Sequence, residues 1–402
     1  MQKLKHVEEQ RGAGRAQILE SIRKAGSIAR IDIAKETLVS PATVTAITSE
    51  LMEAGLIEEI IPDEPRQKAK RGRPRVALKI RSDAFPVAGI KVARESLSIL
   101  LVDFEGNELA AHEYALAEPQ MTPDALAKEI KISVTEACQK AGLDPKDLSA
   151  VGIGLAGLID APRSFVHWSP SLDQRNVDLG EAFSETFDCA VLVENDANLV
   201  AKAEQLFGLG RKVSNFLVIT IEHGVGMGIV IDDKIYRGTR GVGAEFGHAK
   251  VQFEGALCQC GQRGCLEAYI GDYALLREAN AVNIGHPITD LSNLWQMAQD
   301  GNPLATAVFD RARRMFAMGL ANVVNIFDPE LVILAGHRAA FDHLNLEAAT
   351  KEMREHMIRV DVEPTEVVAH QWGDKMWAKG AAAYALDGVS SMKIRELAKN
   401  AG

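Results

Sequence analysis

Cysteine is scarce in this chain of 402 residues, which holds only five. That excludes a dense disulfide framework of the kind that staples small secreted domains. No apolar run approaches the ~20 residues that a membrane-spanning helix needs. The first residues also lack an apolar stretch of signal-peptide type, so we expect a soluble, cytoplasmic protein with no membrane partner.

The net charge of −10 is spread unevenly along the chain. Residues 1–82 contain 16 Lys and Arg against 11 Asp and Glu, a net of +5. The remaining residues contain 29 against 44, a net of −15. A basic head on an acidic body is the pattern expected when only the head meets a polyanion.

Three short helical patterns follow one another within residues 15–54, with a break at Gly26. The third begins with Ser40 as N-cap and Pro41 at the first helical position, and Gly55 ends it. Its apolar residues are expected to face inward. That leaves five residues facing solvent: Thr43, Thr45, Ala46, Ser49 and Glu50.

Two candidate strands, residues 56–61 and 76–80, follow these helices and are joined by a basic segment. This layout predicts a winged helix-turn-helix DNA-binding domain in residues 1–82, with the third helix in the major groove. Because that helix has no Lys or Arg, base contacts must come from uncharged side chains. The candidates are Ser40, Thr43, Thr45 and Ser49.

The basic segment carries the sequence Arg71-Gly-Arg73-Pro-Arg75. It resembles short segments that enter narrow, A·T-rich minor grooves, where negative potential attracts arginine. We therefore expect Arg71, Arg73 and Arg75 to contact DNA. The alternative is a solvated basic linker before the next domain.

One histidine and three cysteines lie within eighteen residues, spaced H-x9-C-x-C-x4-C. A set of imidazole and thiolate ligands favours a closed, tetrahedral structural zinc site. The predicted ligands are His248, Cys258, Cys260 and Cys265. A disulfide pair or reactive thiols are the alternatives, although three thiols cannot all pair with one another.

From about residue 85 onward, strand and helix patterns alternate, which predicts an α/β body. Three motifs in this body together resemble the ROK family: Asn195-Asp-Ala-Asn198, Glu245-x-Gly-His248 and the cysteine run that ends in Glu267. That family groups sugar kinases with repressors of the N-acetylglucosamine, glucose and xylose type. The resemblance covers about residues 86–390.

The resemblance implies a two-lobed, actin-like fold of the ribonuclease-H type. Lobe 1 would comprise residues 83–198, completed by the C-terminal segment 373–402. Lobe 2, with the zinc loop, would comprise residues 199–372.

The resemblance also implies a sugar site. Asp196 takes the position of the family's general base, and Glu245 and Glu267 those of carboxylates that hold sugar hydroxyls. His248 would bind zinc through one ring nitrogen and the sugar through the other. The predicted site is completed by Asn195, Gly157 and Ser171, which stands where family kinases carry an asparagine. For any one carboxylate alone, a surface ion pair is the alternative.

The two phosphate-binding segments depart from the kinase pattern. Lys91–Glu95 replaces Asp-x-Gly-Gly-Thr, and Glu222–Gly228 replaces a glycine-rich loop. We expect Glu222 and Met227 to occupy the space that phosphates would need. Phosphoryl transfer depends on positioning and on metal electrostatics, so we expect no kinase activity.

Our sequence-based hypothesis is a sugar-responsive repressor of carbohydrate uptake or catabolism genes. It would act as a homodimer or homotetramer on a palindromic, A·T-rich operator. One alternative is an active sugar kinase with a DNA-binding head. Others are an activator of transcription, or a regulator whose effector is a phosphosugar or a partner protein.

Overall fold

The computed structural model describes residues 2–61, 76–282, 287–336, 344–359, 361–371, 373 and 375–400. These residues belong to two compact units. The first comprises Met1–Gly157, Arg163–Glu194 and Ala378–Gly402; the second comprises Leu158–Pro162 and Asn195–Trp377. The finer division into a head and two lobes stays a prediction. Within the described ranges, no helix is both long and apolar enough to cross a membrane.

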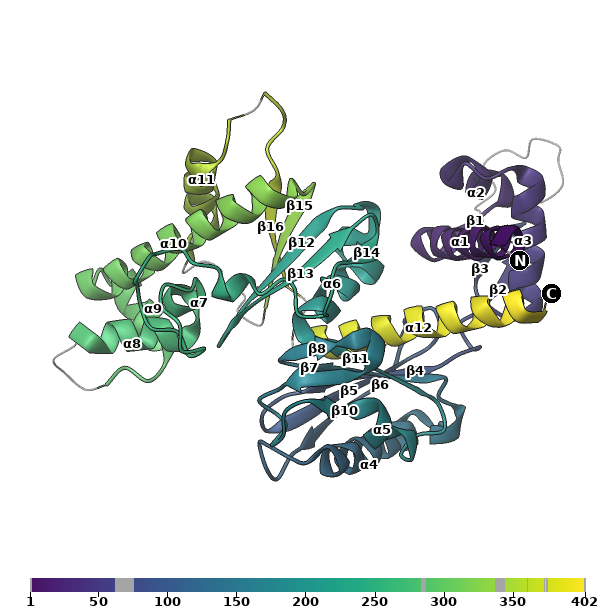
Figure 1. Ribbon diagram of the computed structural model, residues 1–402, viewed down its shortest axis with the longest axis horizontal. Coiled ribbons are helices and arrows are strands. Elements are labelled where there is room, and N and C mark those ends of the chain that lie inside the picture. The colour runs from purple at the N-terminus through teal and green to yellow at the C-terminus, as the bar shows by residue number, and fades with distance from the viewer. Residues whose placement is uncertain are drawn as a thin grey trace. The chain divides into compact units, whose positions relative to one another are not determined.

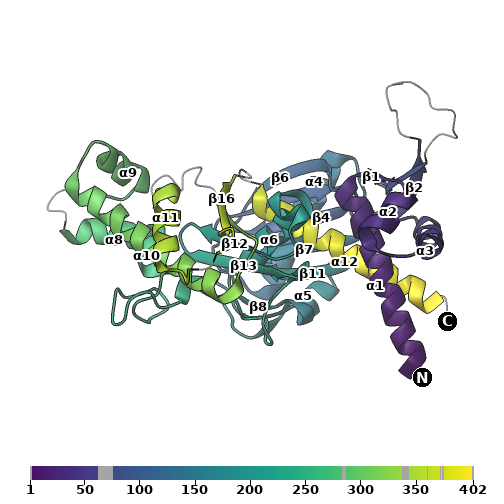
Figure 2. The same cartoon turned by 90° about the horizontal axis from the view of Figure 1, so that it is seen from above.

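The N-terminal part of the first unit packs three helices against a small sheet (Figure 2). Its core is formed by the apolar faces of the helices, and the Ser40 hydroxyl caps the third helix by accepting from the Thr43 amide at 3.2 Å. Both predicted strands are present in the sheet, whose order is β1-β3-β2. The elements are α1 (Gln2–Ala25), β1 (Ser27–Ile28), α2 (Arg30–Thr37), α3 (Pro41–Glu53), β2 (Ile57–Ile60) and β3 (Ala77–Ile80).

One residue of α3 lies differently from the sequence prediction. Glu50, expected to face solvent, turns toward α1 and is only 19% exposed. Its carboxylate accepts from Arg15 Nε at 2.7 Å and also pairs with Arg11. Burial alone would raise the pKa of Glu50, but the hydrogen bonds from Arg15 and Arg11 outweigh it and hold the pKa below its usual value. Glu50 therefore fixes α3 to α1.

A five-stranded sheet forms the centre of the rest of this unit, in the order β11-β7-β4-β5-β6. Strand β4 pairs in parallel with β7 and antiparallel with β5, and β5 pairs antiparallel with β6. Helices α4 and α12 cover opposite faces (Figure 1). The elements are β4 (Val87–Val92), β5 (Ser96–Val102), β6 (Glu108–Ala115), α4 (Pro123–Ala141), β7 (Ala150–Leu155), β9 (Phe165–Trp168), β10 (Val177–Asp178), α5 (Leu179–Ser184), β11 (Ala190–Asn195) and α12 (Met376–Asn400).

Helix α12 packs unusually close to this sheet because two glycines leave it room. Gly89 and Gly152 lie opposite each other in the β4–β7 register. A Cβ at Gly89 would lie 2.1 Å from the Ala378 carbonyl oxygen, and one at Gly152 would lie 2.1 Å from that of Ala381. Backbone atoms cannot move aside as a flexible side chain can, so the contact requires glycine at both positions.

A buried arginine of helix α1 contacts the sheet domain. Arg23, 9% exposed, donates from Nη1 to the Phe104 carbonyl oxygen at 2.7 Å. Its guanidinium also lies over the Phe104 ring, 4.8 Å from the centroid. Burial lowers the pKa of Arg23, while Glu20 and Asp387 of α12 raise it. The three-helix domain and the sheet domain are thus linked by a hydrogen bond and a cation–π contact.

The second unit contains another five-stranded sheet, in the order β14-β13-β12-β15-β16. Strand β12 is antiparallel to β13 and parallel to β15. The apolar core of the second unit lies between this sheet and the helices that follow. The elements are β8 (Leu158–Asp160), α6 (Asp196–Phe207), β12 (Phe216–Ile221), β13 (Val225–Ile231), β14 (Lys234–Ile235), α7 (Glu267–Ile270), α8 (Asp272–Val282), α9 (Leu291–Gln299), α10 (Pro303–Phe327), β15 (Leu331–Ala335), α11 (Leu346–His356) and β16 (Glu366–His370).

The glycine contact beneath α12 can be tested by Gly152→Ala. We expect this substitution to destabilise the first unit by about 3 kcal/mol, because the new methyl group meets the Ala381 backbone. The matched control is Gly12→Ala in α1, where a Cβ meets no atom within 4 Å. There the gain in helix propensity should raise stability by about 0.5–1 kcal/mol. Thermal unfolding followed by circular dichroism measures both, and equal midpoints for the two variants would contradict the close contact.

Candidate functional site

The sugar-site prediction centres on the start of α6, which packs directly on the β12–β13 hairpin. A Cβ at Gly226 would lie 2.9 Å from the Ala197 Cβ, and one at Gly228 would lie 2.6 Å from the Ala201 Cβ. These glycines therefore permit close packing of helix on strand. This packing fixes Asp196, the first residue of α6, beside the hairpin.

Glu222 and Met227 of the hairpin were expected to occupy the space that phosphates would need, and Met227 lies elsewhere. Met227 is 5% exposed and packs in the core of the second unit with Ile219 and Ile229. Strand alternation turns it away from the loop, so that expectation was wrong. Glu222 does lie beside Gly336, where a Cβ would be 3.9 Å from its Oε1.

Four side chains of the segment that follows form a cluster that could hold a metal ion: His248, Cys258, Cys260 and Cys265. Their ligand atoms all lie within 4.8 Å of one another. Two sulfur atoms, of Cys260 and Cys265, are 3.7 Å apart, as are the Cys258 Sγ and the His248 Nδ1. A tetrahedron with metal–sulfur bonds of ~2.3 Å has edges of roughly 3.5–3.8 Å, so the residues present fit such an ion.

The surroundings of the cluster favour thiolates bound to a cation. Burial raises the pKa of the Cys258 thiol to about 12, and a bound cation would lower it. Lys250 Nζ lies 3.1 Å from the Cys265 Sγ and donates to the His248 carbonyl oxygen at 3.0 Å. This lysine offsets thiolate charge and holds the histidine backbone.

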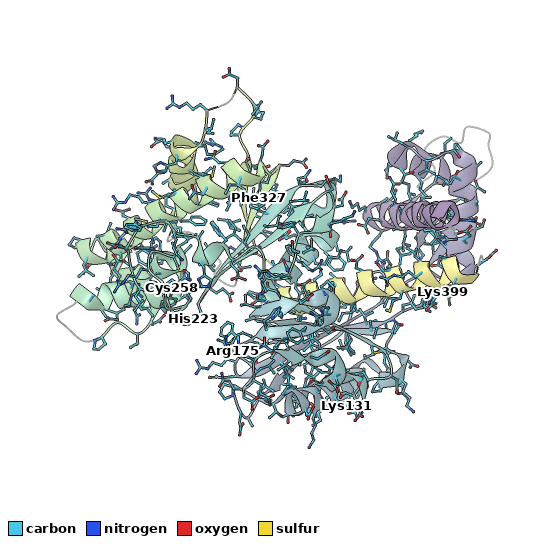
Figure 3. The ribbon with its side chains drawn as sticks, in the orientation of Figure 1. Lys131, Arg175, His223, Cys258, Phe327 and Lys399 are labelled. Carbon is cyan, nitrogen blue, oxygen red and sulfur yellow. The ribbon has the colours of Figure 1, made fainter. Side chains whose placement is uncertain are left out.

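Glu267 connects the cluster to the hairpin; Figure 3 labels one residue of each, Cys258 in the cluster and His223 in the hairpin turn. Its Oε2 accepts from the Val225 amide at 3.2 Å, and its Oε1 lies 3.4 Å from the Cys258 Sγ and 3.2 Å from the Tyr273 hydroxyl. A Cβ at Gly224 would lie 3.1 Å from the Glu267 Oε2. Glycine at this position thus leaves room for the close approach of the carboxylate.

The three predicted carboxylates influence one another. Desolvation raises the pKa of Glu245 to about 7, and the charges of Asp196 and Glu267 add to the effect. Asn195 accepts from the Ala197 amide at 2.9 Å through its side-chain oxygen, and so caps α6. All four residues belong to the second unit.

The two remaining residues of the predicted sugar site belong to the first unit. Ser171 is 7% exposed. Gly157 has a φ of +130°, and a Cβ there would lie 2.2 Å from the Trp168 carbonyl oxygen. The positive φ and the close packing on β9 therefore explain why position 157 holds a glycine.

The predicted DNA-contacting hydroxyls of α3 are half-buried or exposed. Two of them already donate within the helix: Thr45 to the Pro41 carbonyl oxygen at 2.9 Å, and Ser49 to that of Thr45 at 3.0 Å. The hydroxyls of Ser40 and Thr43 lie 2.8 Å apart. The predicted contacts of Arg71, Arg73 and Arg75 lie outside the described residues.

Comparison with known proteins identifies the family. The family model described as "ROK family" matches residues 87–388, which is most of the chain. The chain belongs to the ROK family. A second model, "Winged helix-turn-helix DNA-binding", matches residues 16–58.

Individual relatives include both regulators and kinases. A xylose repressor of Caldicellulosiruptor bescii is 31% identical over 82% of this ROK chain and 84% of its own length. A glucokinase of Streptomyces coelicolor is 33% identical over 73% of this chain and 95% of its own. The crystal structure of a ROK family transcriptional regulator, homologous to the E. coli MLC protein, is 27% identical, with a TM-score of 0.79 over 96% of this chain and 99% of that chain.

Sequence reasoning missed two residues of the ROK site. Lys250 lies two positions after His248, and a cation beside expected thiolates was a signal that could have been used. Tyr273 contacts the cluster from α8, fifteen residues after Cys258. No spacing rule predicts this contact, because the contact depends on how α8 packs against the cluster loop.

The metal cluster can be tested by Cys260→Ser. We expect this variant of the full chain to lose most bound metal, because a hydroxyl is a far poorer ligand than a thiolate for a metal ion that prefers sulfur and imidazole ligands. Elemental analysis of protein purified without added metal measures the stoichiometry. Cys189→Ser, which changes a thiol outside the cluster, is the control and should keep about one metal per chain. Equal metal content in both variants would contradict the ligand set.

The raised pKa of Glu245 predicts how stability depends on pH. Between its ordinary pKa near 4.5 and its folded value of about 7, the folded chain binds more protons at this site than the unfolded chain. This carboxylate therefore lowers stability progressively as pH rises through that window. Glu245 is exposed to solvent, so water screens much of the effect. Glu245→Gln should therefore gain more in melting temperature over wild type at pH 8 than at pH 5; the same difference at both pH values would contradict the shift.

Proposed function

We propose that this ROK protein is a sugar-responsive transcriptional repressor of carbohydrate uptake or catabolism genes, working in the cytoplasm. The observation that carries the proposal is the joining, in one chain, of a winged helix-turn-helix domain to a ROK body with a carboxylate site. The similarity to a xylose repressor covers 82% of the chain. We divide the chain into a head (residues 1–82), lobe 1 (83–198 with 373–402) and lobe 2 (199–372).

The body binds the sugar and one structural zinc ion. Asp196, Glu245 and Glu267 accept hydrogen bonds from vicinal hydroxyls, which charged acceptors hold about twice as strongly as neutral ones. His248, whose Nδ1 faces the Cys258 sulfur, binds zinc and presents its other ring nitrogen to the sugar. Asn195, Gly157 and Ser171 complete the sugar site.

We propose that the body does not transfer phosphate. Lys91 in β4 stands where family kinases place an acidic metal ligand, and Glu222 lies beside Gly336 at the loop end of β15. A carboxylate there repels phosphate oxygens. The rival function, an active kinase, is favoured by the similarity to glucokinases. Sugar-dependent ATP turnover of ~1 per second by the purified full chain would establish that rival.

The head binds a palindromic, A·T-rich operator as part of a homodimer or homotetramer. The hydroxyls of Thr45 and Ser49 donate to their own helix, so their oxygens can still accept from base amino groups in the major groove. Ser40 and Thr43 contact the same groove. Charge attraction comes from Arg71, Arg73 and Arg75, placed in the minor groove.

Two features of the first unit support a route from effector to operator. Helix α12 begins with Met376 and Trp377, which pack in a core of the second unit, and the rest of it belongs to the first. Its Asp387 acts electrostatically on Arg23, which in turn binds Phe104. A displacement of α12 is therefore felt by the arginine that fixes α1.

The deciding experiment measures operator binding with and without sugar at fixed salt. We expect a saturating cognate sugar to weaken binding by about 5–150-fold, the usual range for coupled sites, and operator DNA to weaken sugar binding by the same factor. The sugar is first found by thermal shift on a panel of free and phosphorylated sugars. Glu245→Ala should weaken sugar binding roughly 10-fold and leave operator binding without sugar unchanged.

The matched variant for DNA binding replaces Arg71, Arg73 and Arg75 with neutral residues. It should lower affinity for all DNA and flatten the salt dependence, because fewer counterions are released, while sugar binding stays intact. Identical operator affinity with and without every sugar that binds would overturn sugar control. Tighter operator binding with sugar would replace sugar-induced release of the operator with sugar-induced binding. A response only to a phosphosugar or a partner protein would show that this molecule is the effector.

A further inference from the structure

Tyr273, the second residue of α8, contacts the metal-binding cluster, the Glu267 carboxylate and the hairpin turn. Its hydroxyl is 3.2 Å from the Glu267 Oε1 and 3.6 Å from the Cys258 Sγ. The amide of Gln259, within the cluster loop, donates to this hydroxyl at 3.4 Å. Its ring lies 5.5 Å, centroid to centroid, from that of His223 in the turn.

The hydroxyl of Tyr273 has one proton to give and two acceptors within reach. A phenol carries one O–H donor, and its oxygen is already used by the Gln259 amide. The proton can go to the Glu267 carboxylate or to the Cys258 sulfur. A carboxylate oxygen is the stronger acceptor and is also the closer one.

Metal binding changes how Glu267 is held. When Cys258 is a thiol, its S–H can donate to the Glu267 Oε1, 3.4 Å away. A cysteine that ligates a metal has released that proton to solvent. Among the side chains shown to contact Glu267 in the described residues, Tyr273 is then the donor that remains for Oε1, while the Val225 amide serves Oε2.

We propose that Tyr273 is a positioning residue that holds the Glu267 carboxylate for the effector whenever Cys258 is committed to a metal ion. The proposal rests on the proposed function for its effector half. It makes effector affinity depend on the metal cluster through one side chain that ligates nothing itself. The packing of its ring on His223 extends the same contact to the β12–β13 turn.

The first test measures Zn²⁺ affinity of the full chain by chelator competition and needs no sugar. Tyr273→Phe should weaken Zn²⁺ binding about 10-fold. The reason is that the hydrogen bond from Tyr273 to the charged Glu267 carboxylate matters mainly in the Zn²⁺-loaded protein. In a Glu267→Gln background the same substitution should change affinity less than about 3-fold, because the carboxylate is gone. Equal effects of Tyr273→Phe in the two backgrounds would overturn the proposal.

Tyr269→Phe is the matched control for a merely structural role. The Tyr269 hydroxyl also anchors the cluster loop, accepting from the Ala256 amide at 2.7 Å and donating to Gln252 at 2.9 Å. Among the described residues, this hydroxyl makes no hydrogen bond to Glu267. Removal of the Tyr269 hydroxyl should therefore weaken Zn²⁺ binding by the same factor in the wild-type and the Glu267→Gln backgrounds.

A Co²⁺-loaded sample shows which acceptor takes the proton. If the phenol donates to Glu267, Tyr273→Phe leaves the thiolate-to-cobalt charge-transfer bands in place. A shift of those bands would show a hydrogen bond to the Cys258 sulfur and would overturn the assignment to Glu267.

Effector binding is then measured by calorimetry on Zn²⁺-loaded protein with D-xylose, D-glucose and N-acetyl-D-glucosamine. We expect Tyr273→Phe to weaken whichever sugar the wild type binds by about 10-fold, with operator affinity in the absence of sugar unchanged. Unchanged sugar affinity would overturn the positioning role. If no sugar binds the wild type, the proposed function fails, and the Zn²⁺ cycle still decides the role of Tyr273.

Discussion

The carboxylate of Glu267 is the contact on which the arrangement of the second unit's site depends. One of its oxygens holds the β12–β13 turn through the Val225 amide, and the other faces Cys258 and Tyr273. A charged acceptor of this kind is expensive to leave without donors in a half-buried position. The metal cluster, the hairpin turn and the start of α8 therefore keep their mutual positions together, and loss of one loosens the other two.

Much of this arrangement could be predicted from short-range spacing. The cluster ligands come from one stretch of eighteen residues, so the H-x9-C-x-C-x4-C pattern was sufficient to find them. The N-cap of α3 was predictable for the same reason, since Ser40 bonds to Thr43 three residues later. Contacts between distant segments were not. Nothing in the local sequence indicates that Tyr273 reaches Cys258 or that Gly152 lies under Ala381.

Two wrong predictions have a simple physical origin. Met227 was placed by its position in a loop motif, although strand alternation with Val225 and Ile229 turns it into the core. Glu50 lies one turn after Ile47, on the buried side of α3, and it is tolerated there because Arg15 and Arg11 supply opposite charge. In both cases the periodicity of the element decided the orientation, and in the second a charge from another helix made the burial possible.

The glycines of the β12–β13 turn have a consequence for how such chains diverge. Gly224 makes room for Glu267, Gly226 for Ala197 and Gly228 for Ala201. Each serves packing, whether or not phosphate ever binds. A lineage that gave up phosphate chemistry would therefore keep these glycines under selection for folding alone. Glycine spacing in this turn is therefore a poor guide to whether a homologue is a kinase.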